Sequence, residues 1–322
     1  MSQRAALQIL DDATPPGPVA AEACVLVIGN FDGVHRGHQS VLTEAVEAAR
    51  AQGLVPSVLT FDPHPAAVVG GGAPPVLTTL ERRAELMGEL GVERVYARRF
   101  DADFAGWGPE RFARELVVEA LRARAVVVGQ NFRFGTKRAG DLALLRSLGA
   151  ELGFEVRVHG IARDEKGPFS STRAREAIAA GTLDEAERVL GRPHSLSGVV
   201  VHGQERGRTI NVPTANIAPV AEMLPLDGVY AVRAELLEED GEVVALPGGV
   251  TNIGVRPTVD GTSRTVETYL LGFAGDLYDQ RLRVHLVARL RGEQKFAGLE
   301  ELKAQITRDC LEARRKLGLP TE

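Results

Sequence analysis

The stretch VLVIGNFDGVHRGH, residues 25–38, decides how the first half of this chain folds. It begins as a run that is apolar at every position, which is typical of a strand covered on both faces. The run ends in glycine, and an aspartate, two further glycines and two histidines follow within the same stretch. Glycines and polar residues directly after a buried strand indicate the turn of an open α/β sheet, where ligands bind beyond the carboxyl ends of the strands.

The same alternation of short β-branched runs and longer helical patterns continues to about residue 190. It predicts a parallel, doubly wound α/β domain. Strands are expected at residues 24–31, 54–61, 92–100, 125–129 and 154–160. Helices are expected at residues 37–51, 79–90, 109–122, 140–152 and 171–191.

Short strands separated by turns follow residue 191 and predict a compact antiparallel β-barrel or sandwich. One last helix is expected at residues 298–318, and we expect it to pack across the barrel. Its apolar stripe is expected to consist of Leu299, Leu302, Ile306 and Leu311. The change of pattern predicts two domains, residues 1–184 and residues 185–322.

The composition is that of an ordinary globular protein. The 322 residues are 44% hydrophobic and carry a net charge of −5, so no overall positive field attracts nucleic acid or an anionic membrane. We therefore expect the partners to be small molecules, and we expect binding to neither nucleic acid nor a membrane. Whether the protein forms a homo-oligomer is left open. Cys24 and Cys310 lie far apart in the sequence, and no apolar stretch has the length of a membrane span. These features predict a cytoplasmic protein.

The two histidines of the opening stretch suggest phosphate chemistry. His35 and His38 are three residues apart, so both rings fall on one side of the first helical turn. Gly33 and Gly37 would let a ligand approach the backbone, and the N–H groups of a helix N-terminus favour an anion. A glycine-rich turn with two solvated histidines is the alternative. The H-x-G-H spacing after G-x-F-D resembles the signature of the Rossmann-like HxGH nucleotidyltransferases, which transfer a nucleoside monophosphate and release pyrophosphate.

Three further segments, TFDPHP (60–65), VGQNFRFG (128–135) and SSTRAR (170–175), reach the same edge of the predicted sheet. Gly129 and Asn131 suit close contact with a planar ligand, and Arg175 can reach a phosphate. His64 lies between two prolines, which favours a structural role. Three residues of the last segment are explained equally well by helix capping: Ser170, Ser171 and Thr172.

The second half offers polar groups of another kind. In RGRTINVPTANI (206–217), Thr214 and Asn216 occupy alternate positions of an extended segment and therefore point the same way. A hydroxyl and an amide oxygen suit a magnesium ion that already holds nucleotide phosphates, although a polar surface turn would look alike. Glu267 lies in an otherwise apolar strand. A carboxylate at such a position is either a functional base or half of a buried pair.

In their order along the chain, these segments resemble the bacterial bifunctional riboflavin kinase/FMN adenylyltransferase family, also called FAD synthetase. The HxGH half alone leaves several nucleotidyltransferases open, whereas the PTAN and VET segments indicate flavin. The matching segments are GNFDGVHRGH, TFDPHP, GQNFRFG, SSTRAR, RGRTINVPTANI, GVTNIGVRPTV (249–259), VETYLLGF, GDLYDQRLRV (275–284) and KFAGLEELKAQI (295–306).

The resemblance implies two consecutive reactions. The C-terminal domain would convert riboflavin and Mg-ATP to FMN, with Glu267 as base and with Thr214 and Asn216 holding Mg²⁺ and phosphates. The N-terminal domain would convert FMN and a second ATP to FAD, with His35 and His38 stabilising the leaving pyrophosphate. The remaining residues implied to bind substrates are Gly29, Asn30, Phe31, Asp32, Gly33, Gly37, Gly129, Asn131, Ser170, Ser171, Thr172 and Arg175.

The chain departs from the family pattern in a few places. Asn211 and Val212 precede PTAN where a glycine and an aromatic residue are usual, which predicts a working loop with altered riboflavin affinity. Because aromatic residues are only 5% of the chain, we expect pockets for the flavin ring made mainly of aliphatic side chains and backbone. Two alternatives stay open: another HxGH transferase with an unrelated β domain, and a flavin-binding protein without activity.

Overall fold

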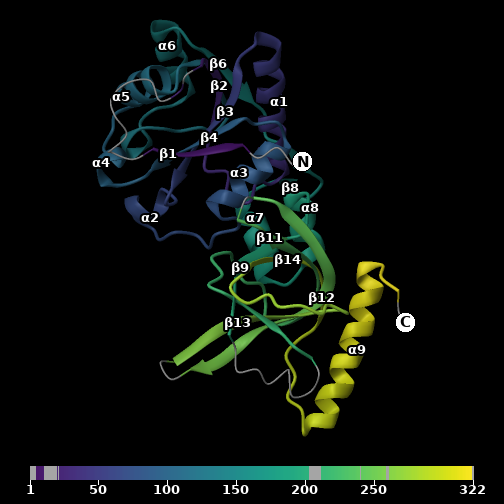
Figure 1. Ribbon diagram of the computed structural model, residues 1–322. Coiled ribbons are helices and arrows are strands. Elements are labelled where there is room, and N and C mark those ends of the chain that lie inside the picture. Colours follow the sequence, from purple (N-terminus) through teal and green to yellow (C-terminus); the bar gives the residue numbers. More distant parts are fainter. Residues whose placement is uncertain are drawn as a thin grey trace. The chain divides into compact units, whose positions relative to one another are not determined.

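The computed structural model describes residues 5–10, 20, 22–202, 212–239, 241–258 and 261–320 (Figure 1). The chain forms two compact units, Met1–Ser171 and Thr172–Glu322. The division lies before the expected boundary between residues 184 and 185. The physical reason is that Leu183 packs in the hydrophobic core of the second unit, so the segment around it groups with that unit.

The first unit contains a six-stranded sheet in which every pair of neighbouring strands is parallel, in the order β1-β4-β3-β2-β5-β6. This confirms the predicted α/β class and all five predicted strands. A sixth strand, β1, lies at the edge and was not predicted. The strands are β1 (Ala6–Leu10), β2 (Cys24–Ile28), β3 (Val55–Asp62), β4 (Arg94–Arg99), β5 (Ala123–Gly129) and β6 (Glu155–His159).

Helices cover both faces of this sheet, so alternate residues of β2 enter different cores. Leu26 packs with residues of α6 and the π-helix, whereas Val25 and Val27 pack with residues of α1 and α3. The segment predicted as one helix at 109–122 is a short α-helix that continues as the π-helix. The helices are α1 (Arg36–Gln52), α2 (Ala66–Val69), α3 (Leu80–Glu89), α4 (Ala102–Ala105), α5 (Pro109–Arg111), the π-helix η1 (Phe112–Ala120), the 3-10 helix η2 (Thr136–Arg138) and α6 (Leu142–Leu152).

The second unit begins with two helices where the sequence predicted one. The helical pattern at 171–191 is interrupted at Gly181, whose φ of +71° lies in the left-handed region that glycine adopts most easily. The result is α7 (Ser171–Ala179) and α8 (Leu183–Leu190). Between β6 and α7 the chain also forms a two-stranded antiparallel ribbon, β7 (Arg163–Asp164) with β8 (Gly167–Pro168).

A closed antiparallel barrel follows, in the order β10-β13-β12-β11-β14-β9, with β9 pairing with β10 to close it. Of the two predicted architectures, the barrel is therefore the observed one. Tyr230 and Val232 point into the barrel core, whereas Ala231 between them points outward. The strands are β9 (Ser195–Val201), β10 (Ala215–Ala218), β11 (Gly228–Leu237), β12 (Val243–Thr258), β13 (Gly261–Leu270) and β14 (Arg281–Arg291).

The last helix, α9 (Leu299–Leu317), packs across the outside of the barrel as predicted, against β11, β12 and β14 (Figure 1). The predicted stripe is only partly correct. Leu299 and Leu311 are 51% and 40% exposed, whereas Asp309 and Ala313 are buried. Asp309 and Ala313 continue the side of the helix on which Leu302 and Ile306 lie, at spacings of three and four residues, whereas Leu311 lies off that side. Asp309 forms an ion pair with Arg291 of β14 there.

Candidate active sites

The N-terminus of α1 brings His35 and His38 together. The side chain of His35 caps the helix, because its Nδ1 atom accepts a hydrogen bond of 3.3 Å from the backbone N–H of His38. The two rings stack with their centroids 3.6 Å apart, and the ring of Phe31 packs edge-on against His38 at 5.0 Å. As predicted, both imidazoles lie on one side of the first helical turn.

The glycines of this turn are required by the packing of the turn itself. A Cβ on Gly29 would lie 2.9 Å from the ring of Phe31, and a Cβ on Gly37 would lie 3.0 Å from the ring of His35. Gly33 has a φ of +85°, and its N–H donates to the hydroxyl of Thr78 at 2.9 Å. The N–H of Gly33 is therefore engaged within the protein, a use that the sequence did not indicate.

Asp32 holds the turn to the loop that precedes α3. Its carboxylate, only 4% exposed, accepts hydrogen bonds from the backbone N–H groups of Leu77 and Thr78 at 3.1 and 2.9 Å. The hydroxyl of Ser171 donates to the carbonyl oxygen of Asp32 at 2.8 Å. Asp32 and Ser171 therefore fix the backbone beside the histidine pair, and the side chain of Asp32 is buried.

Asn30 presents a buried polar atom at the same turn. Its side-chain Oδ1 has no hydrogen-bond partner among the residues that the structure describes. Its backbone carbonyl accepts hydrogen bonds from the Thr60 hydroxyl at 3.0 Å and from the Arg83 guanidinium at 3.2 Å, which hold the residue in place. A buried oxygen without a partner is costly unless water or a ligand satisfies it.

The end of β5 forms a cavity of about 420 Å³ near the predicted residues Gly129 and Asn131. Asn131 lines it together with Arg133 and Arg138. Phe134 is buried and stacks on Phe132 with a centroid distance of 5.5 Å, so these rings pack the loop. This edge of the sheet therefore offers two guanidinium groups and an amide.

The remaining predicted residues of the first half have mixed positions. The Nδ1 atom of His64 accepts a hydrogen bond of 3.1 Å from the N–H of Ala66. Ser170 directly precedes α7 in the first unit. Thr172 and Arg175 lie on α7 within the second unit.

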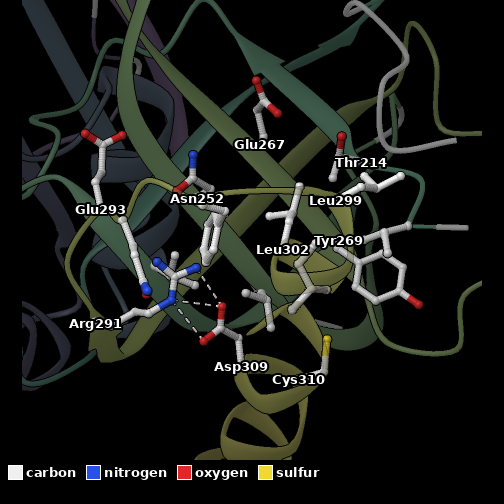
Figure 2. A pocket seen from close by; sticks show the side chains of 16 residues that line it. Thr214, Asn252, Glu267, Tyr269, Arg291, Glu293, Leu299, Leu302, Asp309 and Cys310 are labelled. Atoms are coloured by element: carbon white, nitrogen blue, oxygen red, sulfur yellow. Dashed lines mark hydrogen bonds and ion pairs between the residues drawn. The ribbon is translucent and has the colours of Figure 1, made fainter. Parts of the chain in front are cut away.

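A second cavity, of about 560 Å³, lies between the outer face of the barrel and α9 (Figure 2). Thr214 and Glu267, both predicted site residues, line it, and so does Val212. Asn211 lies outside the described residues. Half of the lining is apolar, and most of these apolar residues are aliphatic. The apolar lining residues are Val212, Val229, Val250, Tyr269, Phe296, Leu299, Leu302 and Ile306.

Glu267 lies between two asparagines in the sheet. It is the direct partner of Asn216 on β10 and of Asn252 on β12. Its neighbours Val266 and Thr268 are 2% and 1% exposed and point into the barrel, so Glu267 points outward into the cavity. The carboxylate is therefore part of the cavity lining.

An ion pair at the opposite side of this cavity was not predicted. The Arg291 guanidinium donates to the Asp309 carboxylate through Nε at 3.0 Å and through a terminal nitrogen at 2.8 Å (Figure 2). Gln305 also donates to Asp309, at 2.8 Å. This pair joins β14 to α9. Cys310 also lines the cavity. Burial, and then the nearby Asp309 carboxylate, raise the pKa of its thiol, which therefore stays protonated.

The chain matches two family models. The model described as FAD synthetase matches residues 18–173, and the model described as riboflavin kinase matches residues 190–317. The predicted domain boundary falls in the stretch between these matches. The second match removes the alternative of an HxGH transferase with an unrelated β domain. Within the part of the chain that the structure describes, no helix is long and apolar enough to cross a membrane.

Curated relatives match nearly the whole chain. The bifunctional riboflavin kinase/FMN adenylyltransferase of Escherichia coli (strain K12) is 44% identical over 92% of this chain and 94% of its own length. The protein of the same name from Pseudomonas fluorescens is 41% identical over 90% and 92%. A crystal structure from Streptococcus pneumoniae, described as a macrolide-efflux protein, has a TM-score of 0.81 at 29% identity and covers 94% of this chain and 97% of that one.

Proposed function

The chain belongs to the bifunctional riboflavin kinase/FMN adenylyltransferase family, and from this membership we propose which residues carry out its two reactions. It is an enzyme that phosphorylates riboflavin with ATP to give FMN and then adenylylates FMN with a second ATP to give FAD and pyrophosphate. The adenylyltransferase half comes first in the chain and the kinase half second.

In the kinase reaction, Glu267 acts as the general base. It accepts the proton of the terminal ribityl hydroxyl while that oxygen attacks the γ-phosphorus of ATP, and ADP leaves. Support comes from its position, because the carboxylate faces the cavity between two amide side chains and Thr214 lines the same cavity. Such a transfer depends mainly on positioning and charge neutralisation, so the base contributes together with the groups that hold the phosphates.

Thr214 and Asn216 hold the magnesium ion that accompanies ATP. The described residues contain no cluster of three or more His, Cys, Asp or Glu side chains that could hold a metal. A hydroxyl and an amide oxygen next to a carboxylate fit Mg²⁺, which prefers few protein ligands and takes the rest from phosphates and water. When bound, the ion neutralises the charge that develops on the transferred phosphoryl group.

The aliphatic side of the cavity binds the isoalloxazine ring. Leu299, Leu302 and Ile306 from α9 face Val229 and Val250 from the barrel across the cavity. A flat apolar ring between aliphatic side chains gains the free energy of buried apolar area. This arrangement directs the ribityl chain toward the polar end, where Glu267 lies.

In the adenylylation reaction, the phosphate of FMN is itself the nucleophile and needs no base. One of its oxygens attacks the α-phosphorus of ATP, and the bond to pyrophosphate breaks. The stacked pair of His35 and His38 and the N-terminus of α1 stabilise the charge on the phosphates. Ser170 takes part in binding the pyrophosphate, and Thr172 and Arg175 remain predicted phosphate-binding residues of α7.

We further propose a cytoplasmic enzyme whose partners are its small-molecule substrates rather than nucleic acid. The net charge of −5 gives no field for a polyanion. Cys24 is buried and its thiol lies 3.2 Å from the Leu121 carbonyl oxygen, and both cysteines are free thiols, which fits a reducing compartment.

The orientation of Glu267 into the cavity between the barrel and α9 carries the proposal. To test it, the protein is incubated with riboflavin, ATP and Mg²⁺, and the flavins are separated by chromatography over time. We expect FMN to appear first and FAD afterwards. Binding of riboflavin without any turnover would contradict the proposal and favour a flavin-binding protein.

A further inference from the structure

Asn252 and Glu293 line the same cavity as Glu267, and the reactions proposed above use neither side chain. Together with Glu267 they form a row of hydrogen-bonding groups. Asn252 is the direct partner of Glu267 across β12 and β13. Because Ile253 is fully buried in the barrel core, its neighbours Asn252 and Gly254 point outward. Direct partners have Cβ atoms about 4.5–5.5 Å apart, so one bound chain can contact Glu267 and Asn252 together.

The third group of this row is Glu293, which follows β14. Its carboxylate occupies the space that a side chain at position 254 would fill, because a Cβ on Gly254 would lie 1.9 Å from Oε1 of Glu293. Glu293 lines the same cavity as Asn252 and Glu267. Glycine at position 254 is therefore what allows this carboxylate to lie against β12.

The cavity consequently has two chemically different sides. In Figure 2, Glu293 and Asn252 lie on one side, and Leu299, Leu302 and Tyr269 lie on the other. A carboxylate, a carboxamide and a second carboxylate offer both acceptors and donors in succession. A chain of neighbouring hydroxyl groups has the complementary pattern, because each hydroxyl both donates and accepts.

We propose that Asn252 and Glu293 bind the inner hydroxyl groups of the ribityl chain and so make the enzyme specific for a polyhydroxylated flavin side chain. This inference rests on the proposed function, in which Glu267 takes the terminal hydroxyl. A site built to bind hydroxyl groups discriminates strongly against an analogue that lacks them, because its own polar groups then lose their partners. Asn252 and Glu293 are thus specificity residues.

The test compares two substrates with one enzyme. Riboflavin is compared with 7,8-dimethyl-10-(5-hydroxypentyl)isoalloxazine, which has the terminal hydroxyl but none of the inner ones. The variants are Asn252→Ala, Glu293→Ala and Gly254→Ala, the last of which displaces the Glu293 carboxylate without removing it. The phosphorylated product is measured by chromatography, and kcat/KM is obtained for each substrate.

We expect each variant to lower kcat/KM for riboflavin by about tenfold or more, the equivalent of one lost hydrogen bond to a charged or buried group. We expect kcat/KM for the hydroxypentyl flavin to stay within about twofold, so the preference for riboflavin falls. Val255→Ala is the matched control, because Val255 is 49% exposed on the opposite face of β12. It should change neither value.

An equal loss for both flavins would overturn the inference, because it would show general damage to the site. An unchanged preference for riboflavin in all three variants would also overturn it. Thermal unfolding of each variant distinguishes a folded protein from an unfolded one before the comparison is made. If the unaltered protein phosphorylated neither flavin, the proposed function itself would fail, and the inference with it.

Discussion

His35 caps the helix on which His38 stands, through a hydrogen bond of 3.3 Å from the backbone N–H of His38 to Nδ1 of His35. The same two rings stack at 3.6 Å. One side chain therefore caps the start of the helix and, in the proposed mechanism, also contributes an imidazole to the phosphate site. The consequence is that the two functions can be separated by substitution.

The variant His35→Asn keeps a good N-cap and removes the imidazole. We expect FAD formation from supplied FMN to fall by about 10²–10³-fold, the loss typical of removing one preorganised group that stabilises transition-state charge. The thermal unfolding midpoint should change little, and FMN formation from riboflavin should be unaffected. His35→Ala, as comparison, should lose the same activity and in addition about 1 kcal/mol of stability. Unimpaired FAD formation in either variant would show that the pair serves only to shape the turn.

Glu267→Gln should produce the reverse pattern. An amide of the same shape cannot accept the proton of the ribityl hydroxyl, so FMN formation should fall by about 10²-fold or more. Adenylylation of supplied FMN should continue at the normal rate, because its nucleophile is already an anion. Both rates are measured by chromatography of the flavins. Kinase turnover close to that of the unaltered enzyme would remove Glu267 from the role of base.

The ion pair between Arg291 and Asp309 should hold α9 against the kinase cavity. Asp309→Asn leaves the Arg291 guanidinium without its charged partner, and we expect a loss of about 1–3 kcal/mol in urea unfolding of the second unit. The KM for riboflavin should rise, because α9 forms one side of the cavity. Glu312→Gln breaks an exposed pair with Arg315 on the same helix and should change stability by less than about 0.5 kcal/mol. Equal effects of the two substitutions would contradict a special role for Asp309.

Glu222 should make stability depend on pH. Burial raises the pKa of this carboxyl, which accepts a hydrogen bond of 2.6 Å from Ser197. The folded state then binds the proton more tightly than the unfolded state, so the contribution of this group is fully present below its unfolded pKa and is lost as pH rises through the folded pKa. Glu222→Gln removes that loss. Relative to the unaltered protein, the variant should gain stability as the pH rises above the unfolded pKa of about 4 in urea unfolding. A difference that does not vary with pH would contradict this.

Some features of the fold were predictable because they depend on local patterns. β2 and most of β5 are buried runs that are apolar on both faces, and five of the six strands of the sheet were predicted. The edge strand β1 was missed because only Leu10 among its residues is buried, so its sequence lacks that signal. The break at Gly181 was missed because a lone glycine in a helical pattern is often tolerated.

Some features of the candidate sites were likewise predictable from local patterns, and others were not. The histidine spacing and the outward position of Glu267 follow from helix and strand periodicity. The contact of Asp32 with Leu77 and Thr78, and that of Glu293 with Gly254, join residues far apart in the sequence. Such contacts depend on tertiary packing, which periodicity does not record. Asn252 had a usable signal, because a strand whose core residue is Ile253 must direct residue 252 outward.

The central claim is that the two reactions use separate sets of residues, and mixing two variants tests it most directly. One variant lacks both imidazoles, His35→Ala with His38→Ala, and the other carries Glu267→Gln. With riboflavin, ATP and Mg²⁺, the first alone should accumulate FMN, and the second alone should leave riboflavin unchanged. The mixture should form FAD, because FMN made by one protein is adenylylated by the other. Absence of FAD from the mixture of two folded variants, or FAD formed by either variant alone as fast as by the mixture, would contradict this separation of the two sites.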